Sequence, residues 1–207
     1  MPGQRLPSNA TDMRSQILNA ALEVIASVGV HRTTHRRIAF AARVSPGSLT
    51  YHFKNLDSII ESAFDFMSTS MSNYYKMKLS ESTDIQDAID SVVDIICDRK
   101  YADPRRMALL FEMYSYANHN DKVSEISREW LAHSRKSLLL HFSPEAAEAL
   151  DVLIEGWPMH RAFHGEELDR ALVHGVVSAI VESRPARTAC PEHPNAYSPG
   201  VESRDSL

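Results

Sequence analysis

The apolar residues of this chain recur at three- and four-residue intervals, the spacing that places side chains on one face of an α-helix. The first such run starts at Asp12 and ends before Gly29, a residue type that often terminates helices. Its apolar positions are Ile17, Ala20, Ala21, Val24, Ile25 and Val28. No stretch shows the two-residue alternation of a half-buried strand. The pattern therefore predicts an all-α fold.

Two short helices are expected next, joined by a brief turn. Thr34 can cap a helix over residues 35–42, and Ser45 followed by Pro46 can open another over residues 46–52. The second of these begins with small polar residues. Two short helices around a tight turn are the outline of a helix-turn-helix.

Six further helices bring the expected total to about nine. Capping residues or prolines mark several of their starts. In chain order, the first of these helices follows Asn55, the second begins near Thr83, and the third opens at Asp103-Pro104. The fourth follows the polar break 118–121, and the fifth opens at Ser143-Pro144. The sixth carries Leu168, Leu172, Val176 and Ile180. From residue 184 onward prolines interrupt a polar stretch that is predicted to be disordered.

Composition narrows the class of protein. The chain has 207 residues, 43% of them hydrophobic and 24% charged, which is enough apolar material for a core. Cys97 and Cys190 lie far apart without a CxxC pair, which argues against a zinc finger and fits a reducing compartment. There is no apolar run of membrane-spanning length and no apolar signal segment at the start. We therefore expect a cytoplasmic protein without membrane contact.

Charge is distributed unevenly along the chain. Residues 1–55 hold seven Lys or Arg and two acidic residues, a net charge of +5, whereas the whole chain carries −5. The remainder therefore carries −10. A basic first quarter on an acidic body indicates an anion-binding module, although a merely solvated charged face is the alternative.

The segment 34–60 reads THRRIAFAARVSPGSLTYHFKNLDSII and resembles the N-terminal domain of the TetR family of transcriptional regulators. The matching elements are Thr34, Ile38-Ala39-x-x-Ala42, Val44-Ser45, Gly47-Ser48-Leu49, Tyr51-His52-Phe53 and Asn55. The resemblance is specific over about residues 14–60, and beyond them it is one of layout. Three positions depart from the family pattern: Arg43 replaces a usual glycine, Thr50 an aromatic residue and Leu56 a lysine.

The resemblance implies a three-helix helix-turn-helix domain at 11–55, preceded by a flexible arm at 1–10. It implies a helical effector-binding and dimerisation domain at 56–183, followed by the tail at 184–207. The expected function is that of a repressor, released from a palindromic double-stranded DNA operator by an unknown small-molecule effector. The expected partner is a second copy of the chain, because one such domain reads too few bases.

Donor-rich side chains around the two short helices are the candidate DNA contacts, since phosphates bind donors and the major groove admits a helix with small residues at its start. They are Thr34, Arg36, Arg37, Ser45, Gly47, Ser48, Thr50, Tyr51, His52 and Lys54. Arg36 or Arg37 could reach a guanine edge. Leu49 is expected in the core more than on a thymine methyl, and Phe53 in the core. Tyr51 is expected on phosphate rather than packed, and His52 on DNA or on a nearby carbonyl.

Two further sets of residues follow from the C-terminal helices. Small and apolar positions predict a dimer interface, and an ordinary buried terminal helix is the alternative. The predicted interface residues are Trp157, Leu168, Ala171, Leu172, Gly175, Val176, Ala179 and Ile180. Bulky residues predict an effector cavity, and an ordinary apolar core is the alternative. The predicted cavity residues are Met67, Met71, Met107, Phe111, Tyr114, Trp130 and Trp157. The fourth helix would connect the cavity to the DNA-binding domain.

Rival functions have weaker support. An all-helical enzyme could use Glu112, Glu155 and His160, but the sequence has no nucleophile–base or phosphate-loop motif. A helical adaptor without DNA binding is the other alternative. His160 and His164 have the spacing of a zinc pair with His174 on the next helix, yet no HExxH motif supports a metal. We therefore expect no enzymatic activity, cofactor or metal.

Overall fold

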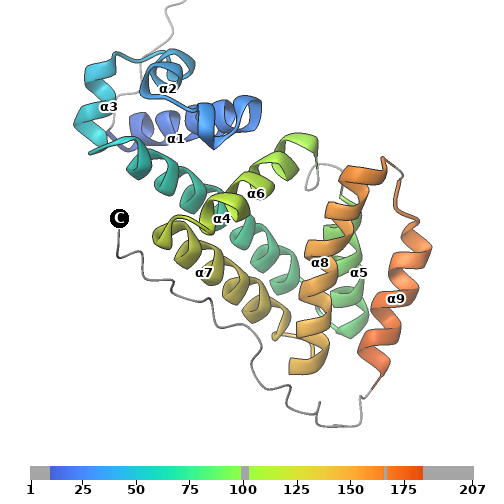
Figure 1. Cartoon of the computed structure of the whole chain (residues 1–207). Helices are drawn as coiled ribbons and strands as arrows, with labels where there is room; N and C mark the ends of the chain where they lie inside the picture. The colour runs from blue at the N-terminus through green and yellow to red at the C-terminus, as the bar shows by residue number, and fades with distance from the viewer. Residues whose placement is uncertain (1–9, 99–102, 166, 184–207) are drawn as a thin grey trace, which may run out of the picture.

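A computed structural model describes residues 10–98, 103–165 and 167–183, and every regular element within them is helical, as the periodicity predicts (Figure 1). A single 3₁₀ turn, η1 (Val30–Arg32), separates the first two helices. The α-helices are α1 (Ala10–Val28), α2 (His35–Ala42), α3 (Pro46–His52), α4 (Leu56–Ser80), α5 (Ile85–Cys97), α6 (Pro104–Ala117), α7 (Asp121–Leu138), α8 (Pro144–His164) and α9 (Arg170–Glu182).

The predicted ends of the chain fall mostly outside this description. The tail at 184–207 and positions 1–9 of the arm lie outside the described residues. Ala10, which the prediction assigned to the arm, is instead the first residue of α1. The domain boundary at residue 55 stays a prediction, although a helix does begin directly after it.

Side-chain caps explain where the helices begin. From α2 to α9, each starts after a residue whose side-chain oxygen accepts a hydrogen bond from a backbone amide of the first turn, which satisfies one of the free donors there. The caps are Thr34, Ser45, Asn55, Asp84, Asp103, Asn120, Ser143 and Asp169. Proline follows three of them, where its missing N–H costs nothing. These local signals account for the accuracy of the predicted starts.

The helices form two regions connected by α4. Helices α1, α2 and α3 gather at one end, and α4 runs from them into the body, where it packs along α7 (Figure 1). At the far end α5 contacts both α8 and α9. Helix α6 contacts α1 as well as α7 and α8, so it touches both regions. None of the described helices combines the length and the apolar character needed to cross a membrane.

One continuous apolar core runs through both regions. Near the amino end it includes Ile17, Ile25 and Ile38, and in the body it includes Phe64 and Trp130, all at most 1% exposed. Burial of each such side chain stabilises the fold by about 2 kcal/mol. The core thus fixes the short helices to α1 and α4 and leaves their polar faces to solvent.

Candidate nucleic-acid interface and cavity

The structure separates α2 and α3 into a buried apolar side and an open polar side. Leu49 and Phe53 are 1% and 5% exposed, so both belong to the core, as expected. Tyr51, between them in sequence, is 84% exposed, which excludes the packed alternative within this chain. Of the predicted DNA contacts, Ser48 and His52 are half-buried and the others are exposed: Thr34, Arg36, Arg37, Ser45, Gly47, Thr50, Tyr51 and Lys54.

Hydroxyl caps stand at the amino ends of both helices. Thr34 Oγ1 accepts a hydrogen bond from the Arg37 amide at 3.3 Å, and Ser45 Oγ accepts one from the Ser48 amide at 3.2 Å. The Ser45 and Ser48 hydroxyls are 3.0 Å apart. Each hydroxyl also carries a proton that a phosphate oxygen can accept, so the caps can serve both the helix and a bound polyanion.

The two arginines of α2 differ in what holds them. Arg37 Nη1 donates a hydrogen bond to the Arg32 carbonyl at 2.8 Å and so fixes η1 against α2. Arg36 is exposed, and within the described part of the chain its guanidinium has no hydrogen-bond or ion-pair partner. Arg36 is therefore the arginine that is free to reach a base edge.

His52 and Arg14 define the carboxyl end of α3. The His52 ring meets the Tyr51 ring edge to face, with 5.1 Å between centroids. Arg14 of α1 donates to the His52 carbonyl at 3.4 Å and to Ser62 Oγ of α4 at 3.1 Å, and its guanidinium lies 4.4 Å from the Phe53 ring centroid. Sequence reasoning counted Arg14 only as a charge, because its partners lie 38 and 48 residues away.

Helix α6 is bonded to the amino-terminal region at three points, which the sequence did not indicate. Glu112 Oε2 accepts a hydrogen bond from the Val30 amide at 2.8 Å. Arg105 pairs with Glu23 of α1 at 2.6 Å, and Tyr116 Oη donates to Asp57 Oδ1 at the start of α4 at 3.1 Å. The expectation named α4 alone as the connection between the regions, and the structure adds α6.

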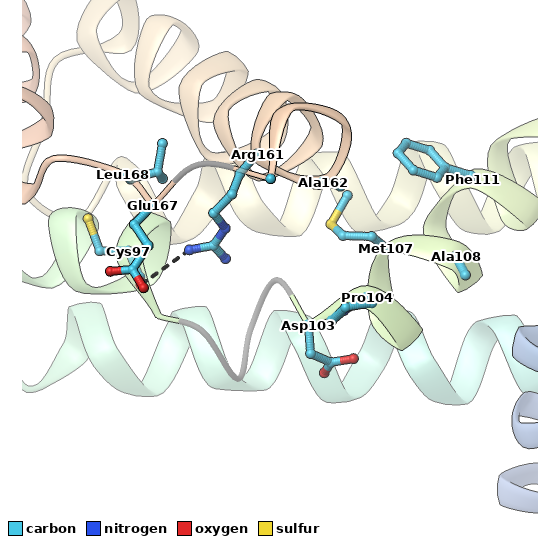
Figure 2. Close-up of a pocket in the computed structure, with 11 residues that line it drawn as sticks. Cys97, Asp103, Pro104, Met107, Ala108, Phe111, Arg161, Ala162, Glu167 and Leu168 are labelled. Carbon is cyan, nitrogen blue, oxygen red and sulfur yellow. Dashed lines mark hydrogen bonds between the residues drawn. The ribbon is translucent and has the colours of Figure 1, made fainter.

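A cavity of about 560 Å³ lies between the end of α5, the start of α6 and the end of α8. Figure 2 shows Met107 and Phe111 on one side and Arg161 of α8 pointing toward Glu167 on the other. Arg161 also donates to the carbonyls of Cys97 and Asp98 at the end of α5, at 3.5 and 3.4 Å. The described lining residues are Cys97, Asp103, Pro104, Met107, Ala108, Phe111, Arg161, Ala162, Gly165, Glu167 and Leu168.

This cavity contains two of the predicted effector residues, Met107 and Phe111. Met67 and Met71 are 6% and 2% exposed and belong to the core. Trp130 is also buried, and it borders a smaller space of about 160 Å³ between α4 and α7. Helical periodicity could not tell these cases apart, because a core position and a cavity wall have the same spacing.

A half-buried pair of polar side chains lies beside the apolar residues of the body. Tyr114 Oη of α6 donates a hydrogen bond to Glu155 Oε2 of α8 at 2.8 Å. Burial raises the pKa of Glu155 to about 7, against the lowering effect of that hydrogen bond. The Tyr114 ring lies 6.1 Å from that of Trp130, and among the described residues the Trp130 indole N–H has no hydrogen-bond acceptor. Tyr114, Glu155 and Trp130 thus form a polar cluster between α6, α7 and α8.

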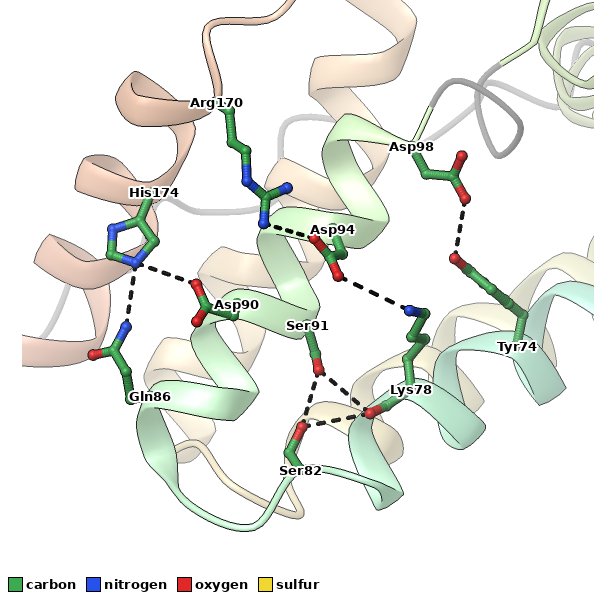
Figure 3. Close-up of polar contacts among 10 residues, drawn as sticks. All are labelled: Tyr74, Lys78, Ser82, Gln86, Asp90, Ser91, Asp94, Asp98, Arg170 and His174. Carbon is green, nitrogen blue, oxygen red and sulfur yellow. Dashed lines mark hydrogen bonds and ion pairs between the residues drawn. The ribbon is translucent and has the colours of Figure 1, made fainter.

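Helix α9 is fastened to α5 along one side. Arg170 Nη2 lies 2.7 Å from Asp94 Oδ1 and His174 Nε2 lies 3.5 Å from Asp90 Oδ1, and both pairs can be followed in Figure 3. Val173 and Val177 of α9 are buried. This places His174 away from any metal site with His160 and His164, and the described residues contain no cluster of three metal-binding side chains.

The opposite side of α9 faces solvent. Leu172 is 58% exposed, Ala171, Gly175 and Ala179 are exposed, and Leu168, Val176 and Ile180 are half-buried. Apart from the backbone of its own helix, no described atom lies within 4 Å of where a Cβ on Gly175 or on Gly156 of α8 would stand. Trp157 is half-buried against the core. The predicted dimer residues therefore include an apolar face that residues 10–98, 103–165 and 167–183 leave exposed.

Comparisons with known proteins agree with this geometry. A family model described as bacterial regulatory proteins of the tetR family matches residues 17–63. The crystal structure of SCO7518 from Streptomyces coelicolor A3(2), described as a candidate transcriptional regulator, is 34% identical with a TM-score of 0.75, and the match covers 83% of this chain and 99% of that one.

Two further proteins extend the comparison. The HTH-type transcriptional regulator BetI of Escherichia coli O157:H7 is 24% identical over 178 residues, 81% of this chain and 91% of that protein. The regulator FadR of Bacillus subtilis, whose crystal structure contains stearoyl-CoA, is 21% identical with a TM-score of 0.63. That match covers 81% of this chain and 97% of FadR, and at this identity it concerns the fold alone.

Proposed function

Since the chain belongs to the TetR family of bacterial regulatory proteins, and is therefore a DNA-binding transcriptional regulator, we propose that it is a homodimeric repressor that a small molecule releases from a palindromic operator. The observation that carries the proposal is the open face of α2 and α3. There the cations and hydroxyls are exposed while Leu49 and Phe53 are buried beneath them. The site of action is the cytoplasm, where bacterial operators lie.

On this proposal the contacts divide by role. Arg36 binds a guanine edge, because it is exposed and has no partner among the described residues. Thr34, Ser45, Tyr51 and Lys54 bind phosphates and set the register of α3 in the major groove, where Gly47 and Ser48 allow close approach. Arg37 contributes mainly by holding η1.

The exposed face of α9 supports dimerisation. Leu172 and its small neighbours Ala171, Gly175 and Ala179 leave room for a partner helix at close range. Two copies related by a two-fold axis would present two α3 helices to successive turns of the duplex. A palindromic operator follows from that symmetry.

The cavity is the proposed effector site. Its lining combines Met107, Phe111 and Leu168 with charged Arg161 and Glu167, which suits an amphipathic small molecule. Helix α6 forms one wall and also binds the Val30 amide through Glu112, so a ligand that displaces α6 would move the helix-turn-helix. FadR, with a similar fold, holds stearoyl-CoA, which makes acyl compounds reasonable first probes.

The test starts from selection of duplexes from a random-sequence pool by the purified full-length protein, followed by gel shifts at several salt concentrations. We expect an enriched palindrome and binding that weakens steeply with salt. Arg36→Ala should relax the preference at one position of each half-site, at a cost of about 1–3 kcal/mol. The control is Arg128→Ala, because Arg128 is an exposed arginine of α7, and this variant should bind DNA with wild-type affinity. Failure to enrich any sequence would overturn the proposal.

A further inference from the structure

Arg43, the residue that ends α2, has a left-handed backbone conformation. Its φ and ψ are 54° and 40°, and it is the one non-glycine residue with a positive φ among the described residues. The Val44 amide donates to the Ala39 carbonyl at 3.0 Å and the Arg43 amide to the Phe40 carbonyl at 3.1 Å. This is the Schellman arrangement, in which glycine is usual at the position of Arg43 because a Cβ strains the backbone there.

The fold gains nothing visible from this arginine. The Arg43 side chain is exposed, and it forms no hydrogen bond or ion pair with any residue that the structure describes. Phe40, one turn earlier on α2, is 86% exposed, so the described part of the chain leaves this edge of α2 open. A residue that strains the backbone and has no side-chain partner among the described residues is a candidate for a contact with another molecule.

The position of Arg43 identifies that contact. It lies two residues before Ser45, the cap of α3. When a helix-turn-helix binds DNA, the amino end of its second helix points into the major groove, so the preceding turn borders the phosphates at the groove edge. A long, permanently charged side chain in this turn is well placed to bind them.

We propose that Arg43 is a phosphate-binding residue of the DNA interface, kept in a left-handed position at a cost to the stability of the helix-turn-helix. The inference rests on the proposed DNA-binding function. The ligand is the phosphodiester backbone, so Arg43 strengthens binding without selecting sequence. In a dimer it adds one contact per half-site.

Three substitutions separate the charge from the backbone strain. Arg43→Lys keeps both, Arg43→Ala removes the charge and keeps the strain, and Arg43→Gly removes both. The affinity of each full-length variant for the duplex enriched by the wild-type protein would be measured between 50 and 300 mM salt. Melting temperatures report on the strain, and Arg128→Ala serves as the distant control.

We expect Arg43→Ala and Arg43→Gly to lose about tenfold in affinity at 0.1 M salt. The slope of log K against log salt should fall by about 2, since each lost phosphate contact contributes about 0.9. Arg43→Lys should keep both values. Arg43→Gly should melt about 2 °C higher than Arg43→Ala.

Each contrary result has a distinct meaning. Unchanged salt slopes in both Arg43→Ala and Arg43→Gly would overturn the inference, because the side chain would then be merely solvated. Weak binding by Arg43→Gly alone would also overturn it, because backbone flexibility rather than charge would be responsible. Absence of salt-dependent DNA binding by the wild-type protein would instead refute the proposed function.

Discussion

The open face of α2 and α3 and the cavity in the body differ in how far a local sequence pattern can locate them, and the reason is physical. Every predicted residue of the face lies between Thr34 and Lys54 and is exposed or half-buried there. The cavity is lined by residues from Cys97 to Leu168, and only two of seven predicted residues are among those described in its lining. A helix face depends on local spacing, whereas a cavity depends on where distant helices fail to fill space.

The largest effect is expected at the exposed face of α9, because the proposed dimerisation there would hold two DNA-binding regions together. Leu172→Glu places a charge where a second copy should pack, and burial of an unpaired charge is costly. The variant should be monomeric by light scattering. Its affinity for the operator duplex should fall about 100-fold or more, because two linked half-sites bind far better than one.

Leu140→Glu provides the matched control for Leu172→Glu. Leu140 follows α7 and is 56% exposed, close to the 58% of Leu172, but it lies outside the predicted interface. This variant should remain dimeric and bind DNA normally. If the two variants behave alike, exposure rather than interface location explains the result, and the proposed dimer is wrong.

Within α3, a pair of substitutions tests whether the buried and open sides of the helix have separate roles. Leu49→Ala should lower the free energy of unfolding by about 3 kcal/mol, because Leu49 is 1% exposed and its removal leaves a cavity. Tyr51→Ala should change stability by less than about 0.5 kcal/mol, since the ring is 84% exposed. It should nevertheless lower DNA affinity about tenfold through a lost phosphate contact.

Urea unfolding and gel shifts on both variants separate the two effects. The prediction fails if Tyr51→Ala unfolds as easily as Leu49→Ala, since Tyr51 would then be structural. It also fails if Tyr51→Ala binds DNA with wild-type affinity.

The same distinction explains how much the sequence revealed. Caps such as Thr34, Ser45 and Asn55 act on amides two or three residues away, so helix starts were predicted closely. The bond between Glu112 and the Val30 amide spans 82 residues and has no local signature. Met67 and Phe111 both have helical spacing, yet one is core and the other borders the cavity. Long-range packing decides such cases, and one sequence does not encode it in any local pattern.

In the body, Glu155 should make the stability of the folded chain depend on pH. Burial raises its pKa from the ordinary value of 4.5 to about 7, so between these pH values the folded chain holds a proton that the unfolded chain has released. Stability should therefore fall as pH rises from about 5 to 8, by at most about 3 kcal/mol. Glu155→Gln keeps an acceptor for Tyr114 Oη and should be more stable than the wild-type protein at pH 8, but not at pH 4.

Denaturant unfolding at pH 4, 5, 6, 7 and 8 would measure this difference. The control is Glu129→Gln, because Glu129 is an exposed residue of α7, and this variant should show the same dependence of stability on pH as the wild-type protein. Parallel profiles for the wild-type protein and Glu155→Gln would show that the pKa of Glu155 is the same in the folded and the unfolded chain, and that the polar cluster is better hydrated than its burial indicates.

The smallest effect is expected where the two regions meet, at Gly29. This residue has a φ of +78°, and a Cβ there would stand 3.0 Å from Glu112 Oε1. Gly29→Ala should therefore cost about 2 kcal/mol, part from backbone strain and part from displacement of the Glu112 carboxylate. Gly165→Ala is a control for a positive φ without a close contact, because its φ is +72° with a ψ of 0° and no described atom lies within 4 Å of the added Cβ, so it should cost only about 1 kcal/mol. The ψ of 164° at Gly29 lies in a different region, so the backbone strain at the two positions is not the same.

A double-mutant cycle with Glu112→Ala isolates the contact between the regions. The cost of Gly29→Ala should shrink once Glu112 is removed, because only the backbone strain remains. An equal cost of Gly29→Ala with and without Glu112 would mean that Glu112 yields freely. In that case α6 would be held to the amino-terminal region only by its other contacts, and a ligand that moves α6 would have little direct effect on α2.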